Sequence, residues 1–347
     1  MSLEKVSIVF YKVEQCGFYK YGESNPEFGD LLVFLDDLYK WSGNKSLAQT
    51  ATYTVARGDD SIPSYLFDIN KGSKGTYLLT VWNESNALDG VSASVDPNSN
   101  VGSVQVDEKK VKRGNIAGFA TYFWFIPSKS LYACVQFGRT TSGNSTMEEY
   151  LENFIDPWSS FVKTKVGANG ERYCVYTDSS GTVHDKVKGK FRTKILRKDG
   201  DVDYIVNNFF DIQKVIRKTS LHMNNSIQKG LMNQLLGGMQ RAINIPIKNI
   251  PNKKINVNYE MPLEFSQAEI KGLIDDWEKN NNHSRSEWDD YGFKMKGQMS
   301  KTRWLSNMNV RLKFDVNVNR SYPSVVSGAS LIAELERKYS SITSNLP

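Results

Sequence analysis

Apolar and polar residues alternate through the stretch from His184 to Lys198. Because strand side chains alternate with period two, the stretch predicts a strand. One face would carry Val187, Gly189, Phe191, Thr193 and Ile195, and the other would carry five cations, Lys186, Lys188, Lys190, Arg192 and Lys194. Like charges side by side destabilise a sheet, so this face is best explained by an anionic partner.

Two later segments show the same pattern. Tyr291 to Met299 places Lys294, Lys296 and Gln298 on one side, and Val310 to Val318 places Arg311 and Lys313 outward with Leu312 and Phe314 inward. The second half of the chain is therefore expected to supply half-buried strands that are apolar on one face and cationic or amide-rich on the other.

Other segments show helical spacing or further strand patterns. Helices are expected at Asp30 to Trp41, after the capping pairs Ser145 with Glu148 and Ser266 with Glu269, at Asp203 to Lys218 and at Ser330 to Ile342. Strands are expected at Val6 to Val13, Phe119 to Ile126 and Leu131 to Phe137, and Arg172 to Tyr176 is expected to pair with Lys186 to Leu196 as a hairpin. Together they predict an α+β fold with two domains and mixed or antiparallel sheets packed with helices.

The length of the chain and the distribution of its charges predict two domains. Its 347 residues exceed the size at which one core usually stops growing, which favours two domains. We place the boundary near Lys163 to Gly170, giving an N-terminal α+β domain (1–165) and a basic C-terminal α+β domain (166–347). The net charge of +6 is the sum of −3 in the first part and +9 in the second. A weak helix at Ser226 to Arg241, interrupted between Gly230 and Gly238, would permit a domain swing.

Cysteine usage and hydropathy bear on location. Cys16, Cys134 and Cys174 are widely separated and show no paired spacing, so neither a disulfide framework nor a zinc site is indicated. The apolar runs are all shorter than about eighteen residues, and the N-terminus lacks the pattern of a signal peptide. We expect a cytoplasmic protein without direct membrane insertion, and no cofactor or metal.

The cationic strands indicate a nucleic-acid site. Lysine and arginine contacts to phosphates supply sequence-independent affinity. Lysine predominates over arginine on the strand, which disfavours bidentate reading of bases, and the single aromatic, Phe191, points to the other face, which disfavours stacking on single strands. The expected function is sequence-nonspecific, non-enzymatic binding of double-stranded DNA by Lys186, Lys188, Lys190, Arg192, Lys194, Lys294, Lys296, Arg311 and Lys313.

Three alternatives remain open. The cations can be guards of a solvated edge strand, or a surface for an acidic protein partner. A nuclease or toxin is the third: Arg217 and His222 form an R-x4-H pair like that of HEPN-type ribonucleases, and acidic groups occur at Asp275, Asp276 and Glu278 and at Glu287, Asp289 and Asp290. Phosphate-loop and nucleophile-elbow motifs are absent from the sequence.

One segment of the first half resembles a known family. A strand leads to Ile126-Pro127-Ser128, a second strand runs through Val135-Gln136-Phe137, and Phe137-Gly138-Arg139-Thr140-Thr141-Ser142 precedes a helix from Thr146 to Phe154. This order is similar to the strand, F-G-x-T-T-S turn and helix of the RexA family of prophage exclusion proteins. The resemblance implies an RdgC-related, two-domain α+β homodimer that binds DNA without sequence preference, acts in anti-phage defence and works with a membrane-protein partner.

Overall fold

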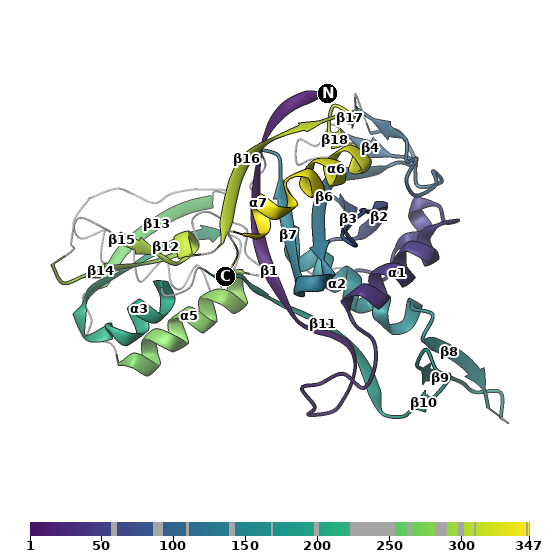
Figure 1. Ribbon diagram of the computed structural model, residues 1–347, viewed down its shortest axis with the longest axis horizontal. Coiled ribbons are helices and arrows are strands. Elements are labelled where there is room, and N and C mark those ends of the chain that lie inside the picture. The colour runs from purple at the N-terminus through teal and green to yellow at the C-terminus, as the bar shows by residue number, and fades with distance from the viewer. Residues whose placement is uncertain are drawn as a thin grey trace, which may run out of the picture. The chain divides into compact units, whose positions relative to one another are not determined.

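The chain forms two compact units in the computed structural model (Figure 1). The first comprises Met1–Leu196 and Val310–Pro347, and the second comprises Arg197–Asn309. The structure describes residues 1–56, 61–85, 93–108, 111–138, 143–167, 169–197, 201–222, 254–261, 266–281, 290–297, 302–308, 310–344 and 346. Within these residues, no helix is both long and apolar enough to cross a membrane.

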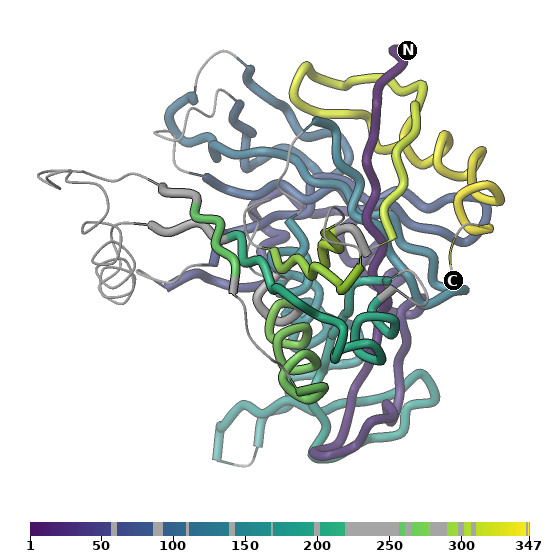
Figure 2. The backbone as a smooth tube through the Cα atoms, turned by 90° about the vertical axis from the view of Figure 1, so that its left-hand side faces the viewer, coloured from purple at the N-terminus to yellow at the C-terminus, as the bar shows by residue number. Residues whose placement is uncertain are grey.

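One long strand organises the first unit. This strand is β1 (Ser2–Lys20), and all its neighbours run antiparallel to it. On one side it pairs with β7 (Leu131–Gln136), and on the other it pairs first with β16 (Arg311–Val318) and then with β11 (Val187–Ile195). Beyond β7 the sheet continues through β6 (Ile116–Ile126), β3 (Tyr77–Glu84) and β2 (Ser64–Lys71), with β4 (Ser94–Val95) and β5 (Val106–Asp107) beside β6. Figure 2 shows β16, in yellow-green, running beside the first half of the purple β1.

Helices cover both faces of this sheet, which explains its apolar central strands. One face packs against α1 (Leu31–Ser42) and α2 (Asn144–Asn153), and the other packs against α6 (Gly328–Arg337) and α7 (Tyr339–Thr343). A short ribbon, β17 (Arg320–Tyr322) and β18 (Val325–Val326), precedes α6. Burial on two sides removes the need for polar positions, so Phe123, Trp124 and Phe125 are consecutive and all fully buried.

The chain leaves the first unit and returns to it at the same edge of this sheet. β11 ends beside the point where β16 begins, because the Val310 N–H donates to the Leu196 carbonyl (2.8 Å) and the Leu196 N–H donates to the Phe10 carbonyl (2.8 Å). Residues 197–309 are thus inserted between two segments that occupy one continuous edge along β1.

The second unit is a small α+β sheet of its own. Its elements are α3 (Asp201–Asn207), β12 (Ile212–His222), β13 (Lys254–Met261), α5 (Gln267–Asn281), β14 (Asp290–Met295) and β15 (Thr302–Trp304). The strands lie antiparallel in the order β13-β12-β14-β15. Val215 and Phe293 of the sheet pack with Ile205 of α3 and with Ile270 and Ile274 of α5. The α+β class predicted from the sequence is therefore confirmed.

Several expected elements differ. The helix expected at Asp203 to Lys218 ends at Asn207, and β-branched residues such as Val215 and Ile216 continue as β12 instead. Arg172 to Tyr176 does not pair with β11. It lies in β9 (Arg172–Thr177), between β8 (Val162–Val166) and β10 (Val183–His184).

The division into units also differs from the expected boundary at 165. The ladder between β1 and β11 places residues up to Leu196 in the first unit, and β16 returns residues from Val310 onward to it. The expected helix at Ser226 to Arg241, with its Gly230 to Gly238 hinge, lies outside the described residues, as do Arg139 to Ser142.

Glu336 of α6 fastens this helix to the turn between β2 and β3. Its carboxylate accepts hydrogen bonds from the Ser73 N–H (2.8 Å) and hydroxyl (2.7 Å), the Lys74 N–H (2.8 Å) and the Thr76 hydroxyl (2.8 Å). Burial raises the pKa of Glu336, but the hydrogen bonds from Lys74, Ser73 and Thr76 together bring it below its ordinary value.

Replacing Glu336 with alanine should destabilise the first unit. We expect Glu336→Ala to lower the free energy of unfolding by about 2 kcal/mol at pH 7, since the Thr76 hydroxyl and the turn N–H groups lose their acceptor. The folded pKa is depressed, so this contribution is present above the unfolded pKa and is lost as the pH falls through the folded pKa. Urea unfolding at pH 7 and at acidic pH, with Glu336→Gln as the isosteric control, measures it. An alanine variant as stable as the parent would contradict it.

Candidate nucleic-acid interface

The expected alternation is present in β11. Val187 and Phe191 are buried (6% and 1% exposed), whereas Lys188, Arg192 and Lys194 are exposed and Lys190 is half-buried. β11 is an edge strand here, since β1 is its neighbour in the described sheet. The four cations therefore line one face of a sheet edge.

Strand β1 adds to this face. Side chains directly opposite each other on paired strands share a face, and Lys194 is opposite Lys12, which is also exposed. The ammonium of Lys190 lies 5.1 Å from the ring centre of Tyr19. Lys12 therefore belongs to the surface, which we call the β11 face: Lys12, Lys188, Lys190, Arg192 and Lys194. In the sequence, Lys12 follows Ile8 and Phe10 at intervals of two, and this spacing was the signal that could have placed Lys12 on their face of β1.

Lys186 lies outside the ladder. The strand begins at Val187, and Lys186 has a left-handed backbone (φ 58°) that interrupts the extended chain before it. Four cations of the stretch, and not five, alternate along the strand, and Lys186 is an exposed residue of the preceding turn.

Arg192 is partly neutralised. Its guanidinium forms an ion pair with Glu152 of α2, although its side chain is still 54% exposed. α2 packs on the other face of the sheet, so Arg192 reaches around the edge to its partner. We therefore assign DNA binding by the β11 face mainly to its lysines.

A chain of buried polar groups lies behind this edge. Glu148 contacts the Thr193 hydroxyl, the Thr193 oxygen is 2.9 Å from the Tyr132 hydroxyl oxygen, and Tyr132 donates to the amide oxygen of Asn144. In this chain the Thr193 hydroxyl donates to Glu148 and the Tyr132 hydroxyl donates to Asn144. Burial raises the pKa of Glu148 to about 7, against the lowering effects of Thr193 and Arg192.

Arg311 and Lys313 do not join the β11 face. Arg311 is opposite Val9, whose side chain lies in the core beneath α1 and α2. Lys194 is opposite Lys12. Lys12 follows Ile8 and Phe10 at intervals of two, so it lies on the face of the sheet that packs against α6. Both Arg311 and Lys313 are exposed, but they lie on the opposite face of the sheet.

Lys294 and Lys296 belong to the second unit. The ammonium of Lys294 lies 3.0 Å from the Glu260 carboxylate, which also binds Lys214 at 2.9 Å. The hydrogen bonds from these lysines, that from Lys214 first, lower the pKa of Glu260. Lys296 is exposed. Eight of the nine predicted cations are thus divided among the β11 face, the opposite face of the same sheet and the second unit, and the ninth, Lys186, lies in the turn before β11.

Arg217 and His222, the residues of the nuclease hypothesis, do not lie in the secondary structure that was expected for them. Arg217 and His222 lie on strand β12 and not at the end of a helix. The Arg217 guanidinium lies 4.2 Å from the ring centre of Tyr291. The helical context of the R-x4-H motif is therefore missing.

The acidic groups are dispersed in the described residues. Asp275 and Asp276 are exposed on α5, whereas Asp290 is buried and accepts hydrogen bonds from the Ser306 N–H (3.1 Å) and hydroxyl (2.6 Å). Glu287 and Asp289, and the side chain of Glu278, lie outside the description. Among the residues that are described, no group of three or more His, Cys, Asp or Glu could hold a metal ion.

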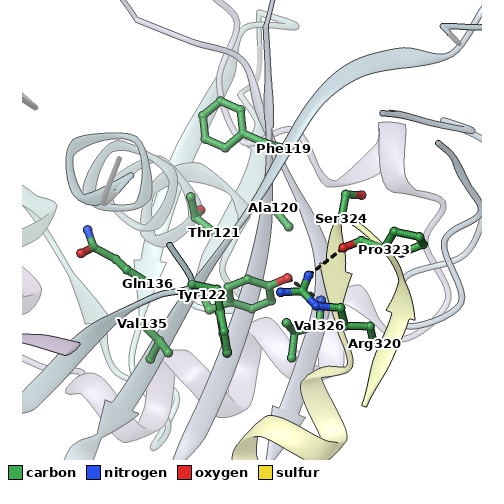
Figure 3. A pocket seen from close by; sticks show the side chains of 11 residues that line it. Phe119, Ala120, Thr121, Tyr122, Val135, Gln136, Arg320, Pro323, Ser324 and Val326 are labelled. Carbon is green, nitrogen blue, oxygen red and sulfur yellow. Dashed lines mark hydrogen bonds between the residues drawn. The ribbon is translucent and has the colours of Figure 1, made fainter. Parts of the chain in front are cut away.

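A cleft that the sequence did not indicate lies at the end of β7 (Figure 3). Its volume is about 160 Å³, and it lies where Phe119 to Thr121 of β6 extend past the last residue that pairs with β7. The lining residues are Phe119, Ala120, Thr121, Tyr122, Val135, Gln136, Phe137, Arg320, Pro323, Ser324 and Val326.

Arg320 is the one charged side chain among these described lining residues, and it already has partners. Its Nε and Nη2 donate to the Glu4 carboxylate (2.8 and 2.6 Å), and its Nη1 donates to the Pro323 carbonyl (2.8 Å). Because the guanidinium is neutralised, the cleft has no free cation for a phosphate. The β11 face is the better candidate.

Known proteins offer no further guide to the candidate surface. Comparisons of the chain with protein-family models, with curated proteins and with solved structures found no match.

Proposed function

We propose that the protein binds double-stranded DNA without sequence preference and that the β11 face is the contact surface. The observation that supports this most is the arrangement of Lys188, Lys190 and Lys194 on one exposed face of an edge strand, with Lys12 beside them. A face that only guards an edge would not need a second strand to add a cation of the same sign.

The dimensions fit a nucleic-acid backbone. Six residues of strand separate Lys188 from Lys194, which corresponds to about 20 Å. A duplex of that length carries about twelve phosphates, so each cation has several phosphates within reach. Flexible lysine chains act as point charges that do not need a fixed geometry, and the one arginine is engaged by Glu152. Contact with the backbone, and not with base edges, follows from this composition.

The resemblance to the RexA family adds a biological setting to the proposal. In this setting the protein is a homodimer of a prophage exclusion locus and has a membrane protein as its partner. A neighbouring gene for a small multi-span membrane protein would support it. The binding proposal does not depend on this setting, because it rests on the charges of the β11 face.

The salt dependence of binding tests the proposal. If Lys12, Lys188, Lys190 and Lys194 each neutralise a phosphate, the logarithm of the association constant should fall by at least about 3 units per tenfold rise in salt. Fluorescence anisotropy with labelled duplexes of unrelated sequence measures the slope, and the affinities should agree among sequences. A strong preference for one sequence, or a slope near zero, would count against backbone binding by this face.

A further inference from the structure

The ribbon of β8 and β9 is solvent-exposed on both faces toward its tip. Val166 is 65% exposed and Tyr173 is 48% exposed. Lys163, Lys165 and Arg172 are exposed as well. A β-strand of a folded domain normally buries one face, so a ribbon with two open faces is suited to enter a partner.

Cations lie on both faces of the ribbon. Lys163 is opposite Val175 and Lys165 is opposite Tyr173, so the two lysines share one face with an aromatic ring. Arg172 is opposite Val166 and lies on the other face with Cys174. In the described part of the chain, Lys163, Lys165 and Arg172 have no carboxylate within ion-pair distance. These charges are therefore available to a polyanion.

The base of the ribbon is held firmly. The Tyr176 hydroxyl donates to Asp156 (3.2 Å), and its ring lies 5.2 Å from that of Phe18 in the core. His184 Nε2 lies 2.8 Å from the Asp178 carboxylate. The ribbon thus extends from a fixed root (Figure 1), and Lys165, Val166, Arg172 and Tyr173 toward its tip are exposed.

We propose that this ribbon, formed by β8 (Val162–Val166) and β9 (Arg172–Thr177), enters the major groove of B-form DNA and adds a second contact to that of the β11 face. The inference rests on the proposed function. The major groove of B-form DNA, about 12 Å wide, admits a two-stranded ribbon. A ribbon inserted by its tip has phosphates on both sides, which matches Lys163 and Lys165 on one face and Arg172 on the other. The deep, narrow groove of duplex RNA excludes side chains, so the ribbon selects DNA.

Cys174 is a built-in probe of this contact. Of the three cysteines, Cys16 and Cys134 are buried and Cys174 is exposed on the ribbon. We expect duplex DNA to slow the reaction of Cys174 with uncharged N-ethylmaleimide about tenfold when about nine-tenths of the protein is bound. Duplex RNA, and DNA with bulky groups on C5 of its pyrimidines that fill the major groove, should protect Cys174 much less.

Charge reversal on the ribbon gives an independent measurement. The Lys163→Glu, Lys165→Glu, Arg172→Glu variant should bind duplex DNA at least about tenfold more weakly, with its salt slope lowered by about 3. Its thermal unfolding should match that of the parent, since these side chains are exposed.

The outcomes separate the two proposals. If the ribbon variant binds like the parent and Cys174 stays reactive in the complex, the ribbon inference is wrong while binding by the β11 face stands. If the parent protein retains no duplex DNA, the proposed function fails, and the ribbon inference fails with it. If the ribbon variant alone loses binding, the ribbon is the contact and the β11 face is not.

Discussion

Reversing Lys188, Lys190 and Lys194 to glutamate is expected to weaken duplex DNA binding about a thousandfold, which corresponds to about 4 kcal/mol. Each change removes one attraction to a phosphate and introduces one repulsion. Arg192 is left in place because its guanidinium binds Glu152 and lowers the pKa of Glu148, so a glutamate there would gather three acids at one point. Anisotropy titrations at one fixed salt concentration measure the loss.

The opposite face of the same sheet supplies the matched control. Lys5, Arg311 and Lys313 are exposed, lie on neighbouring strands β1 and β16, and share the face away from the β11 cations. Reversing these three changes the net charge by the same amount, yet the affinity should fall far less. Both variants should unfold at nearly the parent temperature, because exposed substitutions usually move stability by under about 0.5 kcal/mol each. Equal losses in the two variants, or no loss in the first, would refute the β11 face as the site.

Glu148→Gln is expected to remove a pH dependence of stability worth about 3 kcal/mol between pH 4.5 and pH 8. The folded pKa of about 7 lies above the ordinary value of 4.5, so the folded state holds a proton that the unfolded state releases. This contribution to stability is fully present below pH 4.5 and is lost as the pH rises through about 7. The amide oxygen of glutamine can accept the Thr193 hydrogen bond at every pH and the side chain is never charged, so the variant should exceed the parent in stability at pH 8.

Denaturant unfolding at several pH values compares the parent with Glu148→Gln. Glu149→Gln is the matched control, since Glu149 is the next residue of α2 and its carboxylate accepts a hydrogen bond from the Ser61 hydroxyl at the surface (3.3 Å). The control should keep the parent's dependence of the free energy of unfolding on pH. If the Glu148 variant shows the same dependence, the Glu148 carboxyl is ionised in the folded protein across this pH range, and the proton that we place on it is absent.

The sequence predicted the two half-buried strands at the edge of the first unit well. Period-two alternation specifies both the strand and its inner face, so the inward Val187 and Phe191 and the outward Lys188 and Lys194 were all placed correctly. Alternation does not determine on which face of a shared sheet the polar side of each strand lies. That depends on pairing with β1, which puts the cations of β11 and those of β16 on opposite sides.

Other features depended on contacts that a local pattern does not contain. Ile212 to Lys218 fits an apolar helical stripe, but pairing with both β13 and β14 makes it a strand. The segment near Lys163 to Gly170 has the composition of a linker, yet Lys163 to Val166 belong to strand β8 because they pair with β9. The left-handed backbone of Lys186 has no signature of its own in the residue type.

The position of the inserted unit has a consequence for how this architecture can change over evolution. Leu196 and Val310 are joined by a hydrogen bond, so the host sheet holds the two ends of the insertion side by side. Lengthening, shortening or exchanging everything between them leaves the strand order of the host untouched. Proteins that share the first unit can therefore differ completely in the module that they carry at this point.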